Sequence, residues 1–154
     1  MALGSYGRLA WCFFKWDNIL LIIFYLNHMR FLLLVKSSLK VETGALPDLQ
    51  LFAAMEKYND RLKAAGMLLG LDGLEPSAKG VRIGFGGGEP TVTPGPFPLP
   101  EELVSGYWII RAASLDEAIA WAKQAPFPGG VIEVRQIQEM ADFSPEIQAA
   151  IDRK

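Results

Sequence analysis

The stretch Phe31-Leu32-Leu33-Leu34-Val35 is a continuous apolar run that ends at Lys36. A run of this length favours a β-strand, because a buried helix usually needs at least about ten residues. Polar residues do not alternate with the apolar ones, so both faces of the strand are apolar and both should be covered. The rest of the chain must therefore provide, or recruit, two covering surfaces.

Two amphipathic helices are predicted to cover one of these faces. The first begins at Asp48, a good N-cap, and ends near Gly66, where a left-handed glycine belongs. Its apolar residues recur at helical spacing: they are Leu51, Phe52, Met55, Tyr58 and Leu62. The second begins with the capping box Ser114-Leu115-Asp116-Glu117, in which Ser114 caps the amide of Glu117. Both helices thus have a defined start and an apolar side to bury.

Three further strands and a β-hairpin complete the pattern. The strands are predicted over residues 67–71, 107–112 and 131–137, and the hairpin over residues 81–93 with a glycine turn at 86–88. Glycines and prolines predict loops over residues 37–47 and 94–100. A short C-terminal helix is expected to begin at Ser144-Pro145.

This order of elements indicates the fold class. Strand, helix, strand, hairpin, strand, helix, strand makes two β-α-β units on one sheet, an α+β fold with a ferredoxin-like sheet and helices on one face. The second face of residues 31–35 would stay apolar. A second copy of the same sheet, related by a two-fold axis, is the economical cover. We therefore expect residues 29–154 to form one domain that works as a homodimer.

Composition excludes several classes of function. The 154 residues are 51% hydrophobic and 21% charged, which suits a globular domain. A net charge of −2 provides no basic field for nucleic acid. Cys12 is the only cysteine and His28 the only histidine, so an internal disulfide, a thiolate metal cage and a Ser-His-Asp triad are not expected. We expect no cofactor and no metal, and a reducing, cytoplasmic location.

Residues 1–28 form a separate apolar extension. Their longest apolar run, residues 19–26, has 8 residues, whereas a membrane-spanning helix needs roughly 20. Three interpretations remain open: translated upstream sequence from a start codon assigned too early, a membrane or interfacial anchor, and a signal peptide with a poor cleavage site. The sequence Met29-Arg30-Phe31 would serve as a natural start for the domain.

Several blocks in the domain together resemble a known family. They are Lys79-Gly80-Val81-Arg82-Ile83, Thr91-Val92-Thr93-Pro94-Gly95-Pro96-Phe97, the block 101–110 that ends in Gly106-Tyr107-Trp108-Ile109-Ile110, the helix start Ser114-Leu115-Asp116-Glu117, and Ile132-Glu133-Val134-Arg135-Gln136. In this order they are similar to the YCII-related proteins with a DGPF signature, over about residues 29–143. The resemblance implies a dimeric α/β barrel with a cleft near the DGPF loop, and no established reaction for most members. Some relatives are thought to use a His-Asp pair, and one is implicated in removing chloride from a chlorinated hydroquinone.

The sequence departs from that family at the residues that would do chemistry. Pro94 replaces the aspartate of the signature, and His28 does not match the family's catalytic histidine. A proline cannot act as a general base. The leading interpretation is a small-molecule binding or accessory protein with a degenerate site. The alternatives are an enzyme, lyase-like or dehalogenase-like, that acts in the dimer cleft, and a protein-interaction module.

Seven residues are candidates for lining a pocket: Tyr58, Thr93, Pro94, Phe97, Trp108, Arg111 and Arg135. Arg111 and Arg135 could bind an anionic molecule between two sheets, or form cross-strand ion pairs. Trp108 and Phe97 could form a pocket wall or belong to the core. Tyr58 could donate a proton or pack in the apolar stripe of its helix.

Overall fold

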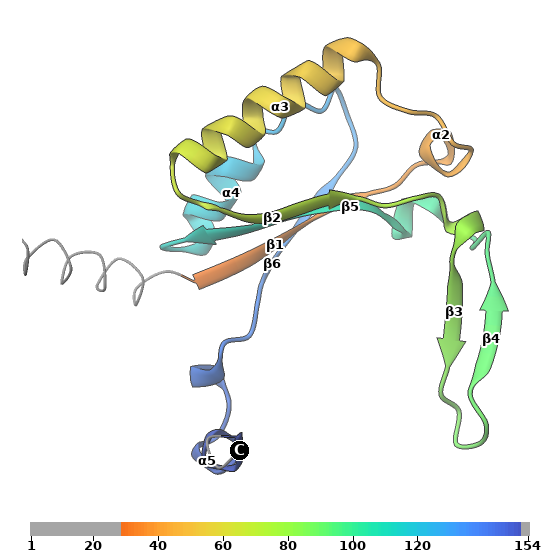
Figure 1. Ribbon diagram of the computed structural model, residues 1–154, viewed down its shortest axis with the longest axis vertical. Coiled ribbons are helices and arrows are strands. Elements are labelled where there is room, and N and C mark those ends of the chain that lie inside the picture. The colour runs from red at the N-terminus through yellow and green to blue at the C-terminus, as the bar shows by residue number, and fades with distance from the viewer. Residues whose placement is uncertain (1–28, 152–154) are drawn as a thin grey trace, which may run out of the picture.

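The computed structural model describes residues 29–151 as a four-stranded antiparallel sheet with helices on one side and a separate hairpin (Figure 1). The interpretations of the N-terminal extension lie outside the described residues. The strands and α-helices are β1 (Met29–Lys36), α2 (Leu39–Glu42), α3 (Leu49–Ala64), β2 (Leu68–Gly73), β3 (Val81–Gly84), β4 (Thr91–Pro94), β5 (Val104–Ala112), α4 (Leu115–Ala122), β6 (Ile132–Gln136) and α5 (Pro145–Ile151). Single 3₁₀ turns lie at Ser77–Lys79, Pro100–Glu102 and Met140–Asp142.

The main sheet has the strand order β2-β5-β1-β6, and all its pairs are antiparallel. The predicted apolar strand is central: Leu33 lies opposite Trp108 of β5 and opposite Val134 of β6. The units β1-α3-β2 and β5-α4-β6 therefore interleave, as in a ferredoxin-like plan. The α+β class is confirmed, and within one chain the sheet stays open and does not close into a barrel.

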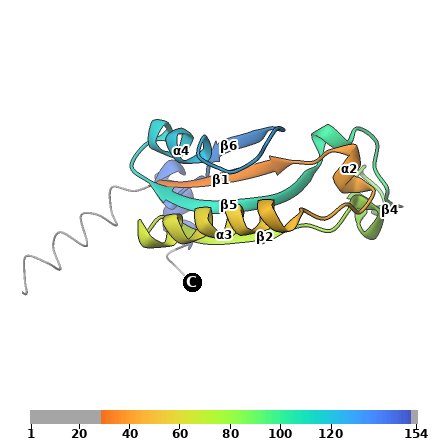
Figure 2. The ribbon, with the colours of Figure 1, turned by 90° about the horizontal axis from the view of Figure 1, so that it is seen from above.

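Helices α3 and α4 lie on the same side of the sheet (Figures 1 and 2). Their apolar sides bury one face of it, where Phe31, Leu33 and Ile110 are completely inaccessible to solvent. Leu62 of α3 and Ala118 of α4 are equally buried against them. Burial of such side chains provides most of the favourable free energy of folding, so this helix-side core holds the domain together.

A buried hydrogen bond between side chains links α3 to the sheet across this core. The indole Nε1 of Trp108 donates a hydrogen bond to Oδ1 of Asn59 at 2.9 Å, and both residues are buried. The ring of Tyr58 meets the Trp108 ring edge-on, with centroids 5.6 Å apart, a favoured aromatic geometry. Helix α3 is thus positioned over β5 by a directional bond as well as by packing.

The predicted helix ends are confirmed. Asp48 Oδ1 accepts from the amide of Leu51 at 2.8 Å, and Gly66 has the left-handed φ of 68°. Ser114 Oγ accepts from the amide of Glu117, as expected of a capping box. The Glu117 carboxylate reaches back to the amide of Ala113, one residue before the cap.

Several predicted boundaries were wrong, including the start of β5, which was expected at residue 107 and lies at Val104. Residues 37–47 were expected to be a loop, but α2 occupies part of them, because Ser38 caps the amide of Val41 and starts one helical turn. Strand β2 was expected over residues 67–71, but it runs from Leu68 to Gly73. Its extension has a tertiary cause, since Gly73 pairs with Gly106 of β5.

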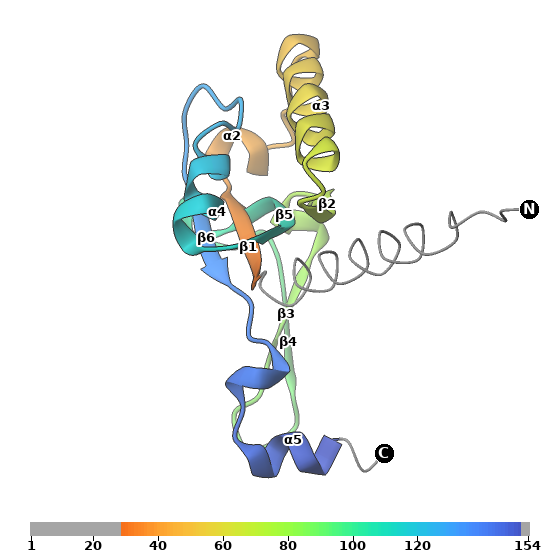
Figure 3. The same ribbon diagram turned by 90° about the vertical axis from the view of Figure 1, so that its left-hand side faces the viewer.

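The second face of the sheet has no helix over it among the described elements (Figures 1 and 3). Leu32 and Leu34 of β1 point to this open face, opposite Ile109 and Tyr107 of β5. Charged residues Arg30, Arg111 and Arg135 share the face at its edges. The sequence argument that a second surface is needed therefore applies to this side of the sheet.

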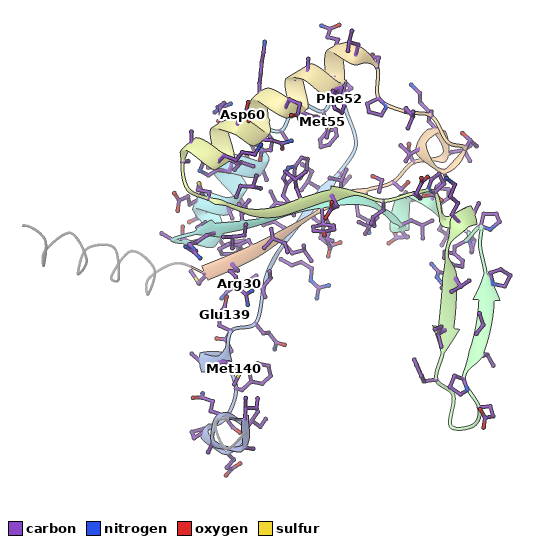
Figure 4. The ribbon with its side chains drawn as sticks, viewed as in Figure 1. Arg30, Phe52, Met55, Asp60, Glu139 and Met140 are labelled. Carbon is purple, nitrogen blue, oxygen red and sulfur yellow. The ribbon has the colours of Figure 1, made fainter. Side chains whose placement is uncertain are left out.

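The first testable consequence concerns the polar contact in the core. Asn59→Ala would leave the buried indole N–H of Trp108 without an acceptor, so we expect it to lower the free energy of unfolding by about 1–3 kcal/mol. Asp60→Ala is the matched control, because Asp60 is exposed on the adjacent position of α3 (Figure 4) and should change stability by less than about 0.5 kcal/mol. Urea unfolding of both variants checks this, and equal stabilities would contradict it.

Candidate functional site

A large open cleft lies between the helices and the sheet. Its volume is about 1530 Å³. Val35, Leu71, Trp108 and Val134 of the sheet form its floor. Its walls are α2 and the first half of α3 on one side, with α4 and the loop after α4 on the other; they contribute Val41, Leu51, Met55, Ile119 and Phe127. Met55 lies on the part of α3 that faces the sheet (Figure 4).

The floor of this cleft is preorganised around Trp108. Its indole is held by Asn59 and Tyr58, as described above, and by the ring of Phe127, whose centroid lies 6.0 Å away. The Tyr58 hydroxyl donates to the carbonyl of Trp121 in α4 at 3.1 Å. The aromatic floor is therefore fixed before any ligand arrives, which reduces the entropy lost on binding.

Charged side chains surround the apolar interior. The lining includes four lysines, Lys36, Lys40, Lys79 and Lys123. Lys36 Nζ donates to the carbonyl of Glu102 at 2.8 Å, and Lys79 pairs with Glu75 at 3.0 Å. Lys40 and Lys123 make no ion pair with any residue from 29 to 151. Their charges are available to an anionic group.

Asp72 and Tyr107 form a polar pair on the open face of the sheet, on the side opposite the cleft floor. The Tyr107 hydroxyl donates to Asp72 Oδ2 at 2.8 Å, across neighbouring strands β2 and β5. This hydrogen bond and the negative charge of Asp72 raise the pKa of Tyr107 above its ordinary value. Tyr107 is therefore protonated and engaged at neutral pH, and it is a poor acid.

Beside the cleft, Glu42 of α2 links several distant segments. Its carboxylate accepts from Ser37 Oγ at 2.9 Å and from the amide of Ser77 at 2.8 Å. The contacts from Ser77 lower the pKa of Glu42, and the Ser37 hydroxyl contributes to the same shift. Ser77 Oγ in turn accepts from the amide of Phe97 at 3.1 Å. One carboxylate therefore connects α2 to the base of the hairpin.

The Gly95-Pro96-Phe97 segment completes this anchor. A Cβ atom added to Gly95 would lie 1.8 Å from the carbonyl oxygen of Ser77, so only glycine fits without a backbone shift. The Arg82 guanidinium of β3 lies over the Phe97 ring, 4.0 Å from its centroid, a cation–π contact. These residues hold the hairpin on the domain, and they border a small pocket of about 280 Å³ that Glu42, Arg82 and Phe97 line.

A comparison with protein families matches residues 29–141 to the YCII-related domain. The chain belongs to the YCII-related family. A search of curated proteins finds no match. The matched range contains the cleft, both β-α-β units and the hairpin, and it ends within the 3₁₀ turn Met140–Asp142, before α5.

In this YCII-related chain the seven predicted pocket residues are not brought together. Trp108 lies in the cleft floor. Phe97 lines the small pocket at the hairpin base. Thr93 and Pro94 are exposed on β4, outside both linings.

The other three predicted residues lie in the core or on the open face. Tyr58 is buried in the core, and burial raises its pKa to about 12. Arg111 and Arg135 are on the open face, and Arg135 Nε is 3.8 Å from Glu133 Oε1. A site that contains these two arginines would therefore have to form on the opposite side of the sheet from the cleft.

The sequence reasoning missed four residues that shape the cleft region: Asn59, Glu42, Lys40 and Lys123. Asn59 carried a usable signal, because a polar residue next to Tyr58 on the inner side of α3 needs a partner. Glu42 and Lys40 lay in a segment predicted to be a loop, where no periodicity assigns a direction to a side chain.

Two further classes of site are absent from the described part of the chain. No group of three or more His, Cys, Asp or Glu side chains between residues 29 and 151 could hold a metal ion. Over the same residues, no helix has the length and apolar character needed to cross a membrane.

The tight packing at Gly95 provides a second test. Gly95→Ala should lower the free energy of unfolding by about 2 kcal/mol or more, because the added methyl group collides with backbone rather than with a flexible side chain. Gly88→Ala adds the same methyl group where nothing lies within 4 Å, so its effect should stay within about 0.5 kcal/mol. Thermal unfolding of the two variants compares them, and a neutral Gly95→Ala would contradict the anchor.

A third test uses the ionisation of Glu42. Its pKa is lowered in the folded chain, so its contribution to stability is present above the ordinary carboxyl pKa and is lost as pH falls through the lowered value. In Glu42→Gln the amide nitrogen cannot accept a hydrogen bond, and we expect a loss of about 1 kcal/mol at pH 7. The gap between wild type and variant should shrink as pH falls below the ordinary carboxyl pKa of about 4.3 and through the lowered value. A gap independent of pH would show that the charge has no role.

Proposed function

We propose that this YCII-related protein binds a small amphipathic anion in the helix-side cleft and performs no acid–base chemistry of its own there. One observation carries the proposal: an apolar, aromatic-floored cleft is bordered by Lys40 and Lys123, whose charges are unpaired among residues 29–151. Ligand sites in proteins are typically concave and apolar, with a few polar groups that set orientation.

The lining favours a particular kind of ligand. Trp108, Phe127 and Met55 provide flat or adaptable apolar surface, which suits an aromatic or aliphatic body. The two lysines suit a carboxylate, sulfonate or phosphate at one end of that body. The cleft, at about 1530 Å³, exceeds the roughly 300–1,000 Å³ of ordinary ligand pockets, so the ligand would fill part of it.

The two positions considered for proton transfer, Tyr58 and Pro94, are unsuited to it, which supports binding without catalysis. Tyr58 has a pKa of about 12, and its hydroxyl donates a hydrogen bond to the backbone carbonyl of Trp121, so it is unsuited to proton transfer near neutral pH. Pro94 has no carboxylate and lies outside the cleft lining. A degenerate site in a family scaffold is consistent with both facts.

The open face supports a second candidate function. Arg30 and Arg111 lie directly opposite one another on β1 and β5, and Arg135 follows on β6. Like charges on neighbouring strands are costly unless something neutralises them; Glu139 pairs with Arg30 and also interacts electrostatically with Arg111. An enzyme that uses these arginines on an anionic substrate between two sheets is the alternative proposal.

We also propose that the protein is a homodimer, with the open faces of two sheets packed together as in a dimeric α/β barrel. Leu32, Leu34 and Ile109 give this face an apolar centre. A two-fold axis would let the same patch serve on both copies. The ligand proposal and the dimer proposal use opposite sides of the sheet and can fail separately.

Dye binding tests the ligand proposal. The fluorescent anion 8-anilinonaphthalene-1-sulfonate should bind to the wild-type chain, and the double variant Lys40→Gln/Lys123→Gln should weaken it about tenfold, since each lysine contributes on the order of 0.7 kcal/mol. Lys57→Gln/Lys63→Gln removes two charges from exposed positions of α3 and should leave binding unchanged. The uncharged N-phenyl-1-naphthylamine should bind all three proteins equally. Equal anilinonaphthalenesulfonate affinities for wild type and both variants would overturn the proposal.

A further inference from the structure

The hairpin is amphipathic, and its apolar face is exposed. Strands β3 and β4 pair Val81 with Pro94 and Ile83 with Val92, so these four side chains share one face, and Phe85 continues it along the chain. We call this set, Val81, Ile83, Phe85, Val92 and Pro94, the apolar hairpin face. Phe85 is 82% exposed and Val92 63%.

The opposite face of the hairpin is polar. It carries Arg82 opposite Thr93 and Gly84 opposite Thr91, and Arg82 packs on Phe97 at the hairpin base. A two-stranded hairpin alone is marginally stable in water, and a patterned apolar face usually marks a buried surface. The hairpin therefore has the sequence of a half-buried element without a cover in residues 29–151.

The C-terminal segment also exposes an apolar surface that nothing in residues 29–151 covers. Its exposed large apolar residues are Met140, Phe143, Ile147 and Ile151, which we call the C-terminal strip. Ile147 and Ile151 lie one turn apart on α5. A helix of 7 residues is too short to be stable without tertiary packing.

Both elements project on the side of the open sheet face (Figures 1 and 3). They leave from opposite ends of the sheet. The hairpin follows Leu74, whose amide bonds to Ser105 at one end of β5, and the C-terminal strip follows Ile137, whose amide bonds to Arg30 at the start of β1. The Glu139 carboxylate takes two hydrogen bonds from the Arg30 guanidinium, at 2.8 and 3.1 Å (Figure 4), and directs the segment below the open face.

This placement fits a second copy of the same chain. When two open faces meet about a two-fold axis that crosses the strands, opposite ends of the two sheets come together. The hairpin of one copy then lies alongside the C-terminal strip of the other. The same rotation also covers Leu32, Leu34 and Ile109. One partner chain therefore buries three apolar surfaces: the open sheet face, the apolar hairpin face and the C-terminal strip.

We propose that the apolar hairpin face of each chain packs against the C-terminal strip of a second copy, so that two exchanged contacts clasp the homodimer. This contact rests on the homodimer proposed above. It identifies the apolar hairpin face and the C-terminal strip as the two segments that hold the dimer together. It also gives Pro94 a role, because proline at this position widens the apolar face where a carboxylate would place a charge in the contact.

Sedimentation equilibrium of the full chain tests the clasp. Ile83→Thr/Val92→Thr keeps β-branched residues in both strands and makes the apolar hairpin face polar, so the dimer dissociation constant should rise by about tenfold or more. Thr91→Ser/Thr93→Ser alters the polar face of the same hairpin and should leave the constant unchanged. Near-ultraviolet circular dichroism checks that the core is intact in each variant.

Cross-linking identifies the surface that the hairpin touches. A photoreactive benzoylphenylalanine in place of Phe85, in a mixture of ¹⁵N-labelled and unlabelled chains, should yield cross-links between differently labelled chains that end in residues 140–151. Cross-links confined to one chain, or an unchanged dissociation constant in Ile83→Thr/Val92→Thr, would overturn the clasp and leave the dimer standing. A monomeric wild-type chain would overturn both and leave dye binding untouched.

Discussion

The hydrogen bond from Trp108 to Asn59 is the constraint on which the helix side of this domain depends. It joins the centre of β5 to α3 across a buried core, at 2.9 Å. A buried indole N–H without an acceptor is costly, so α3 must keep this register over the sheet. Its C-terminal half then packs closely through Leu62, while its N-terminal half leaves the cleft open above Trp108.

A second long-range link fixes the hairpin to the same framework. The Glu42 carboxylate accepts a hydrogen bond from the amide of Ser77, and Ser77 Oγ accepts one from the amide of Phe97. The carbonyl oxygen of Ser77 also lies so close to Gly95 that a side chain would not fit there. The Gly95-Pro96-Phe97 segment is therefore structural in this chain. Since Leu74, Glu75 and Lys79 near the hairpin base also line the cleft, the anchor positions a wall of the cleft as well.

The two faces of the sheet thus have different chemistry. The helix side offers an aromatic floor together with Lys40 and Lys123, which make no ion pair with residues 29–151, and these features support ligand binding. The open side offers aliphatic residues, arginines at its edges, and two projecting segments that carry the apolar hairpin face and the C-terminal strip. These features support association with a second copy. Under these proposals Pro94 affects the open side, where it adds apolar surface to the hairpin.

The sequence by itself determined the elements whose cause is local. The doubly apolar run 31–35, the caps at Asp48 and Ser114 and the glycine hairpin turn all depend on residues within about four positions of one another, so spacing alone predicts them. Only the tertiary structure decided the rest. Trp108 and Asn59 are 49 positions apart, and Ser77 and Glu42 are 35 apart; such pairs depend on strand register and helix placement, which no local pattern encodes. For the same reason the predicted pocket residues are spread over the cleft, the core, the hairpin and the open face, while the lysines of the cleft went unpredicted.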